Sequence, residues 1–207
     1  MRLPHHPEVL DALRTPTADD PWRILISGCM FGWKVAVDGT TYGLDQIRPA
    51  WLESDLVELV PFCPEDHALG TPRAMPDLHD GDGFDVLDGK ARVLDPDRND
   101  LTDKMIAGAR AMAARAAEKR VDFAFLADRS GACGSQVISV GCRFEEPIEY
   151  RKGVGVAAAM LLRQGVPVLS HRDWKTLEIL RSKVETGHVP DASKVDHHEH
   201  PWVLENL

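Results

Sequence analysis

RILISGC, residues Arg23–Cys29, is the stretch that decides the expected fold. An apolar run that ends in small residues is typical of a buried parallel strand that leads into a loop. The runs Asp55–Cys63 (DLVELVPFC) and Val121–Leu126 (VDFAFL) show a similar pattern, and Val166–Leu169 is a shorter fourth candidate. These segments predict parallel strands that are buried on both faces.

Helical patterns lie between the predicted strands. The clearest spans Leu101–Arg120, where alanines fill the segment and apolar residues recur at helical spacing. Gly155–Leu162 and Trp174–Arg181 predict two further helices. Strands that alternate with helices imply right-handed crossovers, so we expect an α/β fold with a mostly parallel sheet.

The length of the chain, 207 residues, suits about one domain with terminal extensions. We predict an N-terminal arm at residues 1–22 with a short helix at Glu8–Arg14, an α/β domain at 23–184, and a polar, histidine-rich tail at 185–207. Glycine and proline recur along Leu69–Gly89, which predicts a long loop.

The composition indicates which partners and which cellular compartment to expect. The net charge of −9 gives no general attraction to a phosphate backbone, which disfavours nucleic acid, although a local basic patch leaves tRNA open. No run reaches the roughly 20 apolar residues of a membrane helix, and the N-terminus lacks a signal-peptide layout. We therefore expect a cytoplasmic protein with no membrane partner, whose four cysteines are reduced thiols.

Three of the cysteines lie at or just past the ends of predicted strands. Cys29 ends the first strand, Cys63 ends the second, and Cys133 lies in the loop after the third. Ligands of open parallel α/β sheets bind beyond the carboxyl ends of the strands. The fold therefore predicts that these thiols, although far apart in sequence, meet in one place.

Several chemistries fit three converging thiols. Thiolates select zinc, copper(I) or iron–sulfur clusters, but structural zinc usually takes four ligands, often from CxxC pairs, and the chain has none. Cys142 is a possible fourth ligand. The alternative is burial, because Val137–Val140 predicts a separate strand just before it. Three ligands suit a [4Fe–4S] cluster with one open iron. Inert buried cysteines, or one nucleophilic cysteine with His67 or His171 as its base, remain alternatives.

Six sequence blocks also occur here in the order typical of one bacterial family. They are SGCMFG…VDG (27–39), VPFCPE (60–65), GTPR (70–73), GDGFDVLDGKARV (81–93), SGACGS (130–135) and GVGVAAAMLLRQGVPV (153–168). The chain resembles, over about residues 24–170, a family that was long a domain of unknown function and includes the thiouracil desulfidases.

The resemblance implies a single Rossmann-like α/β domain in three layers, with helices on both faces of the sheet. It also implies that residues 23–184 are a cluster-binding catalytic domain, with a [4Fe–4S] cluster held by Cys29, Cys63 and Cys133. Such an enzyme removes sulfur from a small thiolated pyrimidine, such as thiouracil or a thiouridine, or from a related thiocarbonyl, without net redox change. Glu65 and Ser130 are the candidates for moving the proton.

The chain departs from the family pattern in two places. Many relatives carry a second cysteine six residues after the first, where this chain has Val35. The usual SPSCG is SGACG here, so Gly131 and Ala132 replace proline and serine. The presumed ligands are kept while the pocket wall differs, so the substrate can differ. The sequence shows no appended second domain, which disfavours the tRNA version of the function.

Weaker candidates for substrate binding are Asp38, Thr71 and Arg73. For Thr71 and Arg73 the alternative is a loop-fixing salt bridge to an aspartate of the segment 80–88, and for Asp38 it is a simple turn. The histidine-rich tail is a possible lid over the site, and Trp202 is a possible anchor for it. A metal- or cluster-binding sensor module and a cysteine hydrolase are the alternative functions, and the sequence makes no prediction of oligomeric state.

Overall fold

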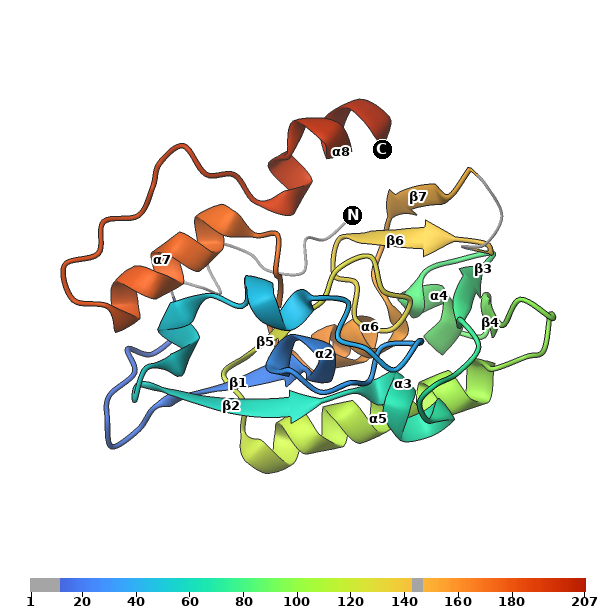
Figure 1. Cartoon of the computed structure of the whole chain (residues 1–207), viewed down its shortest axis with the longest axis horizontal. Helices are drawn as coiled ribbons and strands as arrows, with labels where there is room; N and C mark the ends of the chain where they lie inside the picture. Colours follow the sequence, from blue (N-terminus) through green and yellow to red (C-terminus); the bar gives the residue numbers. More distant parts are fainter. Residues whose placement is uncertain (1–11, 143–146) are drawn as a thin grey trace.

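A computed structural model describes residues 12–142 and 147–207, and a four-stranded parallel sheet forms its centre (Figure 1). The strands stand in the order β2-β1-β5-β8, and every neighbouring pair is parallel. Their bounds are β1 Trp22–Ser27, β2 Val57–Phe62, β5 Phe123–Leu126 and β8 Val168–Ser170. The predicted mostly parallel sheet is confirmed.

Alternation along β1 places apolar side chains on both faces of the sheet. Leu25 packs on one face, in a core shared with helices α5 (Thr102–Lys119) and α6 (Val156–Arg163). Ile24 packs on the other face, in a core shared with α7 (Trp174–Val184). Figure 1 shows α5 and α7 on opposite sides of β1 and β2. Helices therefore cover both faces of the sheet, as the three-layer prediction requires.

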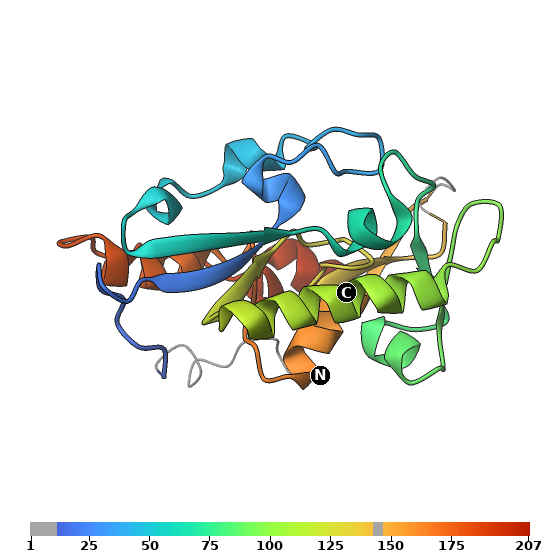
Figure 2. The same ribbon diagram turned by 90° about the horizontal axis from the view of Figure 1, so that it is seen from below.

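The strand order reverses at β1, because β2 lies on one side of it and β5 on the other. Ser27 pairs with Phe62, so β1 and β2 end at the same edge of the sheet. Helix α2 (Gly28–Phe31) follows β1 directly and α3 (Pro64–Leu69) begins just after β2. Figure 2 shows α2 on the side of the sheet opposite α5 and α6. A crevice at such a reversal is the usual ligand position in open α/β sheets.

The prediction of a loop over Leu69–Gly89 is partly wrong. The segment contains β3 (Asp77–His79) and α4 (Gly83–Leu87), and β3 pairs with β4 (Arg92–Leu94) in a small antiparallel sheet. Asp82 and Asp85 form a reciprocal capping box that starts α4. Elements of three to five residues are too short to give a periodic signal among so many glycines.

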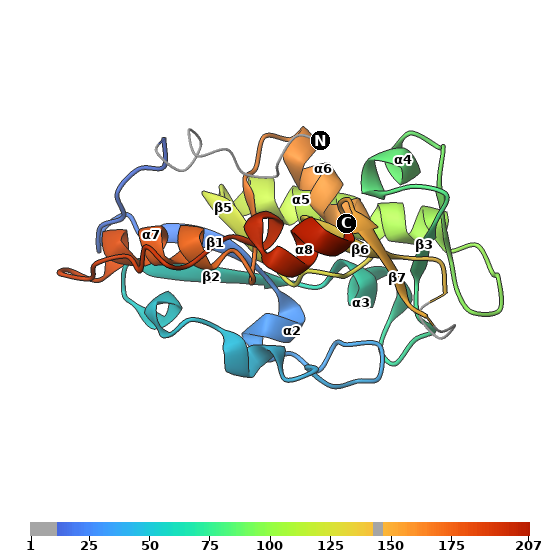
Figure 3. The same cartoon turned by 90° about the horizontal axis from the view of Figure 1, so that it is seen from above.

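The remaining elements connect or extend the sheet. The predicted strand at Val137–Val140 is confirmed, and it pairs with an antiparallel partner. The further bounds are η1 Leu44–Ile47, η2 Ala50–Glu53, β6 Val137–Val140, β7 Glu149–Lys152, η3 His197–Glu199 and α8 Pro201–Asn206. Figure 3 shows α8 between α7 and the β6–β7 hairpin.

The two chain ends differ in what the structure describes. The predicted helix at Glu8–Arg14 falls largely outside the described residues, and residues 12–14 are not helical. The tail, by contrast, contains the two short helices η3 and α8. Within residues 12–142 and 147–207, no helix has the length and apolar character to cross a membrane.

The N-terminus of α6 packs directly on the loop that carries Cys133. Backbone N–H groups of Val156 and Ala157 donate to the carbonyl oxygens of Gly131 and Ala132, each at 2.9 Å. A Cβ atom at Gly155 would lie 2.8 Å from the Gly131 oxygen and closer still to the carbonyl group of Ala132. Gly155 therefore admits no side chain, because α6 packs closely on this loop.

We expect Gly155→Ala to lower the free energy of unfolding by about 3 kcal/mol, because backbone rather than a flexible side chain stands in the way. Gly165→Ala is the control, since open space surrounds that residue and its cost comes from a φ of +79°, at about 1 kcal/mol. Chemical denaturation measures both. Equal losses in the two variants would contradict the close packing of α6 on the loop.

Candidate metal centre

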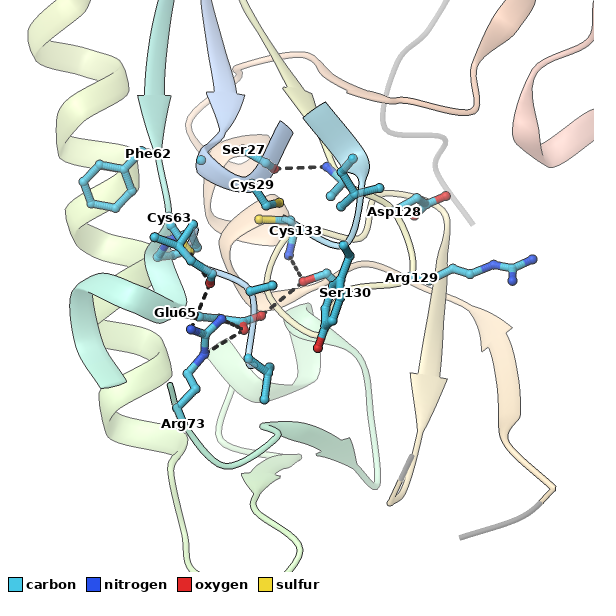
Figure 4. Close-up of a pocket in the computed structure, with 18 of the residues that line it drawn as sticks. Ser27, Cys29, Phe62, Cys63, Glu65, Arg73, Asp128, Arg129, Ser130 and Cys133 are labelled. Atoms are coloured by element: carbon cyan, nitrogen blue, oxygen red, sulfur yellow. Dashed lines mark hydrogen bonds and ion pairs between the residues drawn. The ribbon is translucent and has the colours of Figure 1, made fainter. Parts of the chain in front are cut away.

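The three predicted cysteines meet in one cavity of about 140 Å³ at the carboxyl ends of the strands (Figure 4). Cys29 lies in α2 after β1, Cys63 is the N-cap of α3 after β2, and Cys133 lies in the loop after β5. Cys133 is buried, whereas Cys29 and Cys63 are partly exposed. The topology therefore brings together thiols that the sequence separates by up to about a hundred residues.

The environment of these thiols opposes their ionisation in the absence of a cation. Burial raises the pKa of Cys29 to about 12 and that of Cys63 to about 11, and the neighbouring Glu65 carboxylate adds to both shifts. Burial also raises the pKa of Cys133 well above its ordinary value, with a further contribution from Cys63. Thiolates are the metal-binding form, so a cation must displace the three protons for the centre to assemble.

The three sulfur atoms are spread more widely than the ligands of one ion. Among the described residues, only Asp173, Asp196 and His198 bring three ligand atoms within 4.8 Å of one another, and the cysteines do not. The backbone N–H of Asp66 also points at the Cys63 sulfur, at 3.4 Å. Three soft donors spread this widely fit a multinuclear iron–sulfur cluster better than one zinc ion, and an N–H bond to a sulfur would support either centre.

A carboxylate and a hydroxyl lie beside the thiols. The Ser130 hydroxyl donates to Glu65 Oε1 at 3.2 Å and accepts the Cys133 N–H at 3.0 Å. The other oxygen of Glu65 accepts from two nitrogen atoms of Arg73, at 2.6 and 3.2 Å. The side chains of Arg73 and Glu65 are 5% and 11% exposed, so the guanidinium holds the carboxylate in a largely dry setting. Ser130 thus links Glu65, the proposed acid–base group, to the loop that carries Cys133.

The predicted substrate-binding residues separate into two groups. Arg73 lines the cavity, but its ion pair is with Glu65, so the alternative of a salt bridge from Arg73 to an aspartate of residues 80–88 is wrong. Thr71 donates to Asp66 at 2.6 Å, and Asp38 forms a turn by accepting from the Thr40 N–H at 2.9 Å. Neither Thr71 nor Asp38 lines the cavity, so their role in substrate binding stays a prediction.

Those aspartates are engaged elsewhere, which is the physical reason for the correction. Asp82 and Asp85 cap α4, and Asp88 pairs with Arg163 at 2.5 Å. Arg73 instead reaches back to α3, where Glu65 is the nearest buried acid. No local sequence pattern indicates that Glu65, an acid inside a helix, is the partner of Arg73.

Sequence reasoning missed most of the cavity wall. Tyr42, Leu44, Phe62 and Met75 line it together with Val35. Most of these residues come from loops, where no periodic pattern marks a side chain as facing inward. The wall is apolar and partly aromatic, which suits a flat ring as the ligand.

The remaining candidates lie away from the cavity. Neither His67 nor His171 lines it, and within residues 12–142 and 147–207 no other histidine does. His171 accepts the Asp128 N–H at 3.1 Å, and burial lowers its pKa to about 4. Cys142 is partly exposed and follows β6, and it does not line the cavity either. The fourth-ligand role for Cys142 is therefore not supported for this centre.

A parallel α/β sheet with three thiols and a buried carboxylate at its switch point defines a thiolate-centred ligand site. Comparisons with known proteins agree with this class. Residues 24–173 match the family described as 2-thiouracil desulfurase, and the chain belongs to that family. The resemblance inferred from the six sequence blocks is confirmed.

Two similar proteins extend the comparison. The "Uncharacterized protein YbbK" of Bacillus subtilis (strain 168) is 32% identical over 153 residues, covering 72% of this chain and 96% of its own length. A solved structure titled "[4Fe-4S]-dependent thiouracil desulfidase TudS" is similar with a TM-score of 0.59 and 29% identity, over 72% of this chain and 90% of that one.

We expect the cavity thiols of the cluster-free protein to resist alkylation at pH 8 and to react faster as the pH rises toward 11. The thiolate is the reactive form, and raised pKa values of about 11 and 12 keep its population small until that range. A Cys142→Ser background removes the fourth thiol, and the same protein unfolded in urea is the control. Full modification of the folded protein at pH 8, as fast as after unfolding, would contradict the burial.

Proposed function

We propose that this protein is a [4Fe–4S]-dependent desulfidase that converts a thiolated pyrimidine base, or a related thiocarbonyl, to its oxo form. Water supplies the oxygen and hydrogen sulfide leaves, so the net change is hydrolysis without oxidation or reduction. The observation that carries the proposal is the convergence of three thiols and the Glu65–Ser130 pair on one cavity. Family membership and the solved desulfidase support it.

Cys29, Cys63 and Cys133 would hold the cluster. When bound, it would supply an open iron, which is a Lewis acid for the sulfur of a thiocarbonyl. The chain itself leaves one side of the cavity free of further thiols, since Val35 occupies the wall where many relatives have a cysteine.

The cavity wall would bind and orient the base. Phe62, Met75 and Leu44 present apolar surface to a flat ring. An apolar wall strengthens each polar contact that the ring makes with the remaining residues. Such a pocket suits a small thiolated base, and the acidic net charge of −9 disfavours a polynucleotide.

Glu65 would hold and move the proton. Its Oε1 faces Ser130, so a proton can pass between water, the hydroxyl and the carboxylate over hydrogen-bond distances. Arg73 fixes the other oxygen, which keeps Oε1 turned toward the cavity. The cysteine-hydrolase alternative lacks support, because neither candidate histidine reaches a cavity cysteine.

The direct test is turnover of 2-thiouracil by anaerobically reconstituted protein, with uracil and sulfide measured together. We expect Cys29→Ser, Cys63→Ser and Cys133→Ser each to lose both turnover and the brown absorbance, because each removes one ligand of the cluster. Cys142→Ser is the matched control and keeps both. The account is wrong if only one of the three variants loses activity while all keep their absorbance.

Glu65→Gln tests the acid–base role separately from cluster binding. We expect kcat to fall roughly a hundredfold or more while iron content stays at the wild-type level, because the amide cannot carry the proton. Asp66→Asn is the control, since that neighbouring carboxylate accepts from Thr71 and does not line the cavity. An unchanged kcat in Glu65→Gln would remove Glu65 from the mechanism.

A further inference from the structure

The loop Asp128–Cys133 has an inner and an outer side. Ser130 and Cys133 point toward the cavity. Asp128 and Arg129 also line it, but their side chains point away from the cysteines (Figure 4). Arg129 has a φ of 60°, a left-handed conformation that an arginine seldom adopts. Contacts made by Asp128 and Arg129 therefore help to set the positions of Ser130 and Cys133.

Asp128 fastens the outer side to the C-terminal tail. Its side chain is fully buried, and its Oδ1 accepts from the Ser135 N–H at 3.0 Å, while Oδ2 accepts from the Ser170 hydroxyl at 3.2 Å. Nδ1 of His197, a tail residue that is also buried, forms a short contact with the same Oδ2. A buried carboxylate without such donors would be costly, so His197 is part of what keeps Asp128 in place.

Arg129 makes a second contact with the tail. Its guanidinium carbon lies 4.9 Å from the ring of Tyr150 in β7 and 5.0 Å from the ring of Trp202 in α8. The two rings meet edge to face with centroids 5.9 Å apart. Cation–π contact with both aromatic rings stabilises this direction of the Arg129 side chain.

The tail is itself docked on the body, so it can hold a loop. Asp196 accepts from the backbone N–H and the hydroxyl of Thr176, at 2.9 and 2.6 Å, and the His197 N–H donates to Asp173 at 3.2 Å. Asp173, Asp196 and His198 also bring three possible metal-binding atoms within 4.8 Å of one another. We assign the two carboxylates to docking of the tail, because they already accept these hydrogen bonds. The tail lies beyond residues 24–173, which the family match covers.

We propose that the C-terminal tail is a positioning element of the active site. His197 and Trp202 hold Asp128 and Arg129 on the outside of the loop, and this places Ser130 and Cys133 on its inside, against Glu65 and the other two thiols. Neither tail residue touches the reacting atoms. The catalytic part of this inference rests on the proposed desulfidase function, whereas the coupling of tail to loop does not.

The test compares disruptive and conservative variants at both tail residues. His197→Ala removes the donor to Asp128, and His197→Asn restores one, because an asparagine amide can occupy the place of Nδ1. Trp202→Ala removes the ring over Arg129, and Trp202→Phe keeps a ring there. His188→Ala and Leu204→Ala are the controls, since His188 pairs with Glu178 and Leu204 is 64% exposed.

Two measurements on the cluster-loaded protein do not depend on turnover. We expect His197→Ala and Trp202→Ala to speed amide hydrogen exchange in residues 128–135, and to shorten the half-life of bound iron under a chelator roughly tenfold. His197→Asn and Trp202→Phe should return both values most of the way to wild type. The kcat for 2-thiouracil should follow the same order, with a smaller change in KM.

The outcomes separate the two proposals. Wild-type exchange and iron retention in both alanine variants would overturn the positioning role, as would equal effects in the His188→Ala and Leu204→Ala controls. Faster exchange and iron loss with conservative rescue, in a protein that releases sulfide from none of a panel of thiolated pyrimidines and related thiocarbonyls, would uphold the role of the tail and reject the desulfidase function. If an alanine variant does not fold, failure of its conservative partner to restore protection of residues 128–135 overturns the proposal.

Discussion

The desolvation of three thiols in one cavity is the constraint on which the rest of this structure depends. Each thiol alone would be an ordinary buried cysteine, but together with Glu65 they form a site whose anionic state needs a cation. The parallel sheet makes this possible because β1 and β2 end at one edge and β5 lies beside β1. A centre of this kind is stable as protonated thiols or as a metal-loaded cluster, and it disfavours free thiolates.

Backbone contacts hold the loops that carry these thiols. Helix α6 presents its N-terminal N–H groups to the Cys133 loop, Cys63 caps α3, and Gly28 admits no side chain because Trp33 and Cys63 pack against it. Arg73 then fixes the carboxylate of Glu65, which lines the cavity. Main-chain contacts thus help to place each cavity thiol, and binding sites of this kind require such preorganised support.

The sequence predicted the parts of this site that depend on local pattern. Buried strands, the cysteines that follow them and the nearby Glu65 were all visible, because apolar runs and strand-end positions are local signals. The partner of Arg73, the short elements β3 and α4, and the contact of His197 with Asp128 were not. The last pair is 69 residues apart, and such contacts depend on tertiary packing, which no short window of sequence encodes.

The most direct test of the central claim is the content of iron and acid-labile sulfide in wild-type protein purified without oxygen. The account predicts about four of each per chain, with a broad brown absorbance, because three cysteines are to hold one [4Fe–4S] cluster. One zinc ion per chain, or no metal after anaerobic reconstitution with iron and sulfide, would contradict it.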